Sequence, residues 1–61
     1  MNQKCLLLVE DEPDLRLIMA DSFSDAGFEV VEAEDGDVAV KILEYHPQID
    51  LLITEPIAKS R

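Results

Sequence analysis

Three carboxylates in this sequence stand at the ends of apolar runs. Glu10 and Asp11 follow the run CLLLV, and Glu55 follows the run LLIT. Such runs are typical of buried strands, so these acids are expected at strand ends. Carboxylates that converge within a few ångströms repel one another unless a cation lies among them, and oxygen ligands suit Mg²⁺. The pattern therefore indicates either a Mg²⁺ site or a solvated acidic rim.

Two other residues could take part in chemistry, a cysteine and a histidine. Cys5 is the only cysteine, so no disulfide can form within the chain, and a reducing cytoplasm is the expected location. Because Cys5 lies in an apolar run, we expect it to be a small core residue. His46 precedes Pro47, which suits the C-terminal cap of a helix better than a ligand role.

The elements that would position the acids alternate between strand and helix. Residue patterns predict strands over residues 5–9, 28–33 and 49–54, a helix over about 13–26, and a second helix that ends by His46. A βαβαβ order implies a parallel sheet with right-handed crossovers. Crossovers on opposite faces place the first strand centrally, in the order 2-1-3, and bring all three acids to one carboxyl edge.

Local signals mark the ends of these elements. Asp11 or Glu12 can cap the first helix, and Gly27 can end it in a left-handed conformation. The Asp35-Gly36 pair indicates a turn before the second helix. Arg16 lies one helical turn beyond Glu12, a spacing that predicts a weak surface pair between them.

Length and charge limit the functions that this chain can have. Its 61 residues predict a single domain with a thin core. The formal net charge of -9 argues against binding to nucleic acid or to an anionic membrane, because both require a cationic surface. The apolar runs are also too short for a membrane span. Divalent cations and basic protein surfaces remain as expected partners.

The sequence resembles the receiver domain of bacterial two-component response regulators. LLLVEDEPDLR is similar to that family's first strand and acidic pair, AGFEVVEAEDGDVAVKIL to its second strand and helix, and PQIDLLITE to the approach to its phospho-acceptor. The resemblance runs from about Lys4 to Glu55. It implies a flavodoxin-like α/β fold, and a domain over residues 1–61 that is truncated relative to a whole receiver.

The resemblance also implies roles for particular residues. In receivers the acidic pair holds Mg²⁺, and an aspartate at the tip of the third strand takes a phosphoryl group from a histidine kinase. Glu10 and Asp11 match the acidic pair, with Asp11 at the position of the direct metal ligand. Glu55 stands at the acceptor position. Ile57 matches the position whose backbone carbonyl completes the metal site.

Glu55 departs from the family pattern, because receivers have aspartate there. The extra methylene moves the carboxylate by about 1.5 Å, the length of a C–C bond. Phosphoryl transfer depends on positioning, and a displacement of about 1 Å can reduce its rate on the order of a hundredfold. We therefore expect no phosphorylation at Glu55 and no enzymatic activity. A glutamate could instead imitate part of the charge of a phospho-aspartate.

The stretch PIAKSR at the end of the sequence does not resemble the family's loop after the acceptor, and the chain stops near the middle of the usual fold. The third strand is then expected to be an apolar edge, and such edges recruit partners. Self-association into a homo-oligomer through that strand or the uncovered faces is the resulting structural hypothesis.

Three interpretations of function remain open. The leading one is a receiver-like signalling module of a two-component phosphorelay that acts by protein contact with a histidine kinase or another two-component protein. The first alternative is a working, Mg²⁺-dependent phospho-acceptor. The second is a fragment of a longer receiver with no role of its own.

Overall fold

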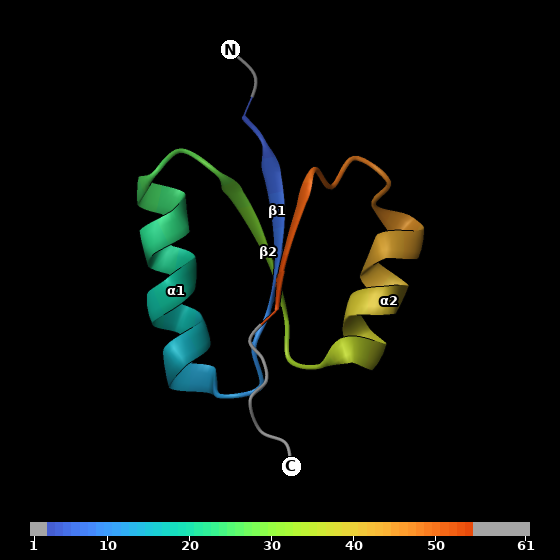
Figure 1. The fold of residues 1–61 in the computed structure, drawn as a ribbon, viewed down its shortest axis with the longest axis horizontal. Helices are drawn as coiled ribbons and strands as arrows, with labels where there is room; N and C mark the ends of the chain where they lie inside the picture. Colours follow the sequence, from blue (N-terminus) through green and yellow to red (C-terminus); the bar gives the residue numbers. More distant parts are fainter. Residues whose placement is uncertain (1–2, 55–61) are drawn as a thin grey trace.

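The computed structural model describes residues 3–54, which form three strands and two helices in the order βαβαβ (Figure 1). The elements are β1 (Cys5–Val9), α1 (Pro13–Asp25), β2 (Glu29–Ala33), α2 (Gly36–Tyr45) and β3 (Leu51–Thr54). The predicted element order is confirmed.

The three strands form one parallel sheet in the order β2-β1-β3. Val9, the last residue of β1, is the register partner of Ala33 in β2 and of Thr54 in β3. The three strands therefore end side by side, and their carboxyl ends share one edge. This confirms the predicted 2-1-3 sheet, with β1 in the centre.

The core is built on both faces of β1. Leu6, Leu7 and Leu8 are each at most 1% exposed. Leu6 and Leu8 pack with Ala20 of α1, whereas Leu7 packs on the other face with Ala39 of α2. Figure 1 shows the two helices on opposite sides of the sheet, as this alternation requires. The apolar run CLLLV is uninterrupted because a helix covers each face of its strand.

The connection from α1 to β2 follows the predicted glycine stop. Gly27 has a φ of 103°, in the left-handed region that favours glycine. β2 begins at Glu29, one residue later than predicted, because the backbone N–H of Phe28 donates to the carbonyl of Phe23. The two rings also meet edge to face, with centroids 6.2 Å apart. Phe28 therefore belongs to the end of the helix rather than to the strand ladder.

α2 begins earlier than the turn signal indicates. Asp35 is its N-cap residue, and its Oδ1 accepts a hydrogen bond from the backbone N–H of Val38 at 2.9 Å. Gly36 is already helical. The Asp35-Gly36 pair is thus a helix start rather than a simple turn, since a short acidic side chain serves equally well in both settings.

β3 begins at Leu51, two residues after the predicted start. The backbone N–H of Ile49 instead donates to the carbonyl of His46, which closes a turn. Asp50 then joins the start of β1 by two hydrogen bonds: its N–H donates to the Cys5 carbonyl, and its Oδ2 accepts from the Cys5 N–H, both at 2.8 Å. Cys5 itself is buried, as expected.

Candidate functional site

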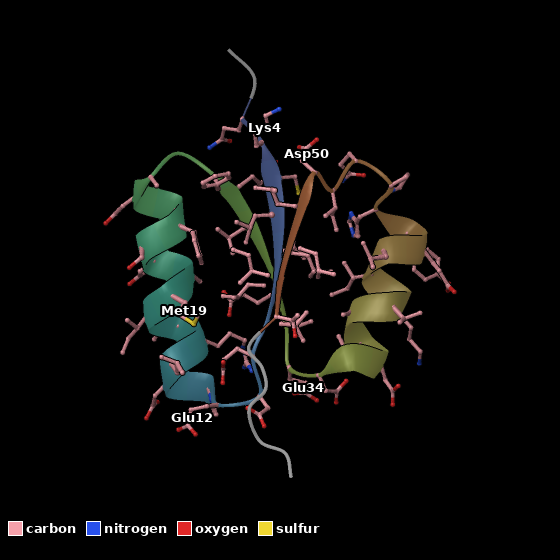
Figure 2. All side chains as sticks on the ribbon, viewed as in Figure 1. Lys4, Glu12, Met19, Glu34 and Asp50 are labelled. Carbon is pink, nitrogen blue, oxygen red and sulfur yellow. The ribbon has the colours of Figure 1, made fainter. Side chains whose placement is uncertain are left out.

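The loop between β1 and α1 leaves the sheet at its carboxyl edge. This β1–α1 loop comprises residues 10–12 and leads into Pro13, the first residue of α1. Figure 2 shows Glu12 together with Glu34, which follows β2, at one end of the molecule, with Lys4 and Asp50 at the other end. The acids that follow the strands therefore gather at one edge, as parallel pairing requires.

Glu10 is a buried acid at this edge, and only 5% of the residue is exposed. Its backbone N–H donates to the Ala33 carbonyl at 3.1 Å, which extends the contact between β1 and β2 by one residue. Its Oε2 accepts a hydrogen bond from the backbone N–H of Glu12 at 3.0 Å. Its Oε1 is buried and has no hydrogen-bond partner among the described residues. A buried carboxylate oxygen without a partner is costly, and a cation would relieve that cost.

Arg16 holds the same loop from the helix. Its Nη1 donates to the main-chain carbonyl of Glu10 at 2.9 Å, and its Nε lies 3.4 Å from Oε1 of Glu32 in β2. The predicted side-chain pair with Glu12 is wrong: the contact between these two residues is the helical hydrogen bond from the Arg16 N–H to the Glu12 carbonyl at 2.9 Å. Sequence spacing misses the true partners because Glu32 reaches Arg16 only through the pairing of two strands.

Glu12 occupies the N-cap position of α1, but its side chain makes no capping hydrogen bond. The expectation that Asp11 or Glu12 caps the helix with its carboxylate is therefore not met at Glu12. The chain instead begins α1 with Pro13 at the first turn, where a missing N–H costs nothing. The backbone N–H of Glu12 instead donates to the Glu10 carboxylate, so the conformation of this loop holds the buried acid in place.

The other predicted ligands are placed only in part. Asp11 is exposed in the β1–α1 loop, directly after the buried acid. Glu55 and Ile57 lie outside the described residues. Within residues 3–54, no group of three or more His, Cys, Asp or Glu residues is arranged to hold a metal ion. The four-residue Mg²⁺ site therefore stays a prediction, of which the structure describes Glu10 and Asp11.

Cys5 and His46 lie away from this edge. Burial raises the pKa of the Cys5 thiol, and the nearby Glu29 and Asp50 carboxylates raise it further. A thiol held in its protonated form is a poor nucleophile, which agrees with a core role. His46 is the C-cap residue of α2, as predicted, and its Nδ1 lies 3.2 Å from Nε2 of Gln48.

Most of this chain is similar to part of a known protein. It is described as "Probable transcriptional regulator ycf27", from Cyanophora paradoxa, and is 40% identical over 53 residues. The match covers 85% of this chain but 22% of that protein, so the chain spans about a fifth of its relative's length. No protein-family model matches the chain, and no solved structure gives a significant match.

Neither helix in the described part of the chain has the length and apolar character needed to cross a bilayer. The 2-1-3 parallel sheet agrees with the flavodoxin-like fold that the sequence motifs imply.

Proposed function

We propose that this chain is a receiver-like signalling module that binds Mg²⁺ at the carboxyl edge of its sheet and acts by protein contact, without phosphorylation at Glu55. The observation that carries the proposal is the buried Oε1 of Glu10, which has no hydrogen-bond partner in the described part of the chain. Asp11 follows it in the same loop. A buried carboxylate with one oxygen that lacks a hydrogen-bond partner, next in sequence to a second carboxylate, costs stability unless a cation binds there.

Glu10 and Asp11 would hold the ion, together with Glu55 and the main-chain carbonyl of Ile57. When bound, Mg²⁺ would neutralise the carboxylates and leave coordination positions for water or a phosphate oxygen. Neighbouring residues would orient the carboxylates before the ion binds. For Glu10, the hydrogen bond from the Glu12 N–H to Oε2 has this role.

A Mg²⁺ titration followed by amide chemical shifts tests this site. We expect shifts in the β1–α1 loop at millimolar Mg²⁺, and no such shifts in Asp11→Asn. Asp25→Asn is the matched control, because Asp25 is an exposed acid at the far end of α1 and the charge change is the same. Loop amides that stay unmoved in the unsubstituted protein would refute Mg²⁺ binding.

Glu55 separates the leading proposal from the alternative of a working phospho-acceptor. Because its carboxylate stands about 1.5 Å further from the backbone than that of an aspartate, we expect no phosphoryl transfer to it. The test is intact-mass measurement after incubation with Mg²⁺ and a small phosphodonor. A phosphoryl adduct that disappears in Asp11→Asn would favour the alternative, since the same Mg²⁺ site would then support transfer.

The protein contacts are proposed to use exposed apolar side chains. Leu17 and Ile18 of α1 are 60% and 62% exposed, and Leu51 and Leu52 of β3 are 43% and 53% exposed. Large apolar side chains exposed on a surface are candidates for contact with other proteins. The proposed partners are a histidine kinase or another two-component protein in the cytoplasm, and a second copy of this chain. Light scattering at micromolar concentration tests the last: a compact monomer would exclude a homo-oligomer.

We do not propose that this chain binds DNA. The relative is named a transcriptional regulator, but this chain matches only 22% of it. The net charge of -9 also disfavours contact with phosphate backbones. Protein contact is therefore the better-supported mode of action for this part.

A further inference from the structure

Three hydrogen bonds close a circuit around the β1–α1 loop. The Glu12 N–H donates to Glu10 Oε2 at 3.0 Å, and the Arg16 N–H donates to the Glu12 carbonyl at 2.9 Å. The Arg16 Nη1 then donates to the Glu10 carbonyl at 2.9 Å. The circuit holds Glu10 by both its side chain and its main chain, so it restricts where the carboxylate can point.

Arg16 is itself anchored on the side of β2. Its Nε lies 3.4 Å from Glu32 Oε1, and its side chain is 21% exposed against 44% for that of Glu32. The guanidinium therefore joins a helix, the loop and a neighbouring strand with two different nitrogens. A lysine has a single ammonium at the end of a flexible chain and could not reproduce both contacts in this planar arrangement.

We propose that Arg16 is a positioning residue for the β1–α1 loop, which carries Glu10 and Asp11 of the proposed Mg²⁺ site. It fixes the β1–α1 loop in the metal-free protein, so that Glu10 Oε1 stays buried, without a hydrogen-bond partner among residues 3–54, and available to a cation. The inference rests on the proposed Mg²⁺ site, and it assigns the preorganisation of that site to Arg16. Outer residues that orient ligands commonly change metal affinity by about 10–100-fold when they are replaced.

Positioning and simple electrostatics predict opposite effects for the loss of Arg16. A positive charge beside a cation site repels the cation, so on charge alone its removal would tighten Mg²⁺ binding. If Arg16 orders the loop, its removal weakens Mg²⁺ binding, because part of the binding free energy is then used to order the ligands. The sign of the change in affinity therefore distinguishes the two.

Mg²⁺ affinities of Arg16→Gln and Arg16→Lys supply the first test. We expect about a tenfold loss of affinity or more in Arg16→Gln. We also expect a loss in Arg16→Lys, which keeps the charge but not the two contacts. Lys41→Gln is the matched control, because it removes a positive charge from an exposed position of α2, and its affinity should be unchanged. Unchanged or tighter binding in both Arg16 variants would overturn the proposal.

Hydrogen exchange in EDTA supplies a second test that needs no metal. The Glu12 amide should exchange faster in the Arg16 variants, while the Leu7 amide of the central strand keeps its protection. Equal loss of protection at both amides would show a general structural role and overturn the proposal. If Arg16→Gln does not fold, Arg16→Lys decides both tests. If the unsubstituted protein fails to bind Mg²⁺, the proposed function fails, whereas the exchange of Glu12 still tests the role of Arg16 in the loop.

Discussion

Replacement of Glu10 by glutamine should stabilise the metal-free protein. The substitution keeps the size of the side chain and an oxygen that can accept from the Glu12 N–H, but it removes the charge from a residue that is 5% exposed. Leaving a buried polar group unpaired costs about 1–3 kcal/mol, and more when it is charged. The glutamine amide nitrogen that takes the place of Oε1 also lacks a partner, so only the additional cost of the charge is removed, and we expect a gain of about 1 kcal/mol in unfolding free energy. In a domain of this size that is about 4–8 °C in Tm.

Mg²⁺ should reverse this advantage. A ligand at ten times its Kd stabilises the folded state by about 1.4 kcal/mol, and glutamine offers the ion a neutral oxygen in place of a carboxylate. The unsubstituted protein is therefore expected to gain about that amount when Mg²⁺ is raised to ten times its Kd. Glu10→Gln is expected to gain almost nothing. The variant would be the more stable protein in EDTA and would lose that advantage at high Mg²⁺.

Urea denaturation followed by circular dichroism, in EDTA and in Mg²⁺, measures both effects. Glu34→Gln is the control, because Glu34 is an exposed glutamate at the same end of the sheet (Figure 2) and the chemical change is identical. It should alter neither the metal-free stability by more than about 0.5 kcal/mol nor the gain from Mg²⁺. A Glu10→Gln protein that is less stable than the unsubstituted one in EDTA, or that keeps the full gain, would refute the reasoning.

Three further predictions concern the structure that supports the site. Burial, together with Glu29 and Asp50, raises the pKa of Cys5 above its ordinary value of 9.0, so the fold favours the protonated thiol. The free energy of unfolding should therefore stay constant below about pH 9 and fall as the pH rises further, and urea titrations should show a smaller fall in Cys5→Ala. Asp50→Ala should lower the free energy of unfolding by about 1.5–3 kcal/mol, because the Cys5 N–H loses a charged acceptor at 2.8 Å. An equal loss in Asp50→Asn, which keeps an acceptor oxygen, would contradict this explanation. Gly27→Ala should cost about 1–2 kcal/mol through its φ of 103° alone, since no described atom outside residues 26–28 lies within 4 Å of an added Cβ. An unchanged urea midpoint would count against this.

The order and type of the elements could be predicted because their signals are local. The run CLLLV indicates a strand buried on both faces, and Leu6, Leu7 and Leu8 are the most buried residues of the described chain. Gly27 marks a position that needs a positive φ. Even the 2-1-3 order follows from general rules for parallel sheets, so it required no knowledge of individual contacts.

Element boundaries were harder to predict, because the same residue type serves in different local structures. Asp35 caps a helix where a turn was expected, and Phe28 closes the end of α1 where a strand residue was expected. In both cases the competing structures differ by one or two hydrogen bonds. Such small differences are decided by the packing of neighbouring elements.

The sequence by itself determined that acids follow the strands and that these acids share one edge. Only the tertiary structure decided that Glu10 is buried, with one oxygen that has no partner in the described part of the chain, and that Arg16 holds its main-chain carbonyl while contacting Glu32. The physical reason is that burial and pairing depend on residues far apart in the chain. Glu32 lies beside this loop only because β2 pairs with β1 in one register, a contact that the sequence spacing of Arg16 and Glu32 does not reveal.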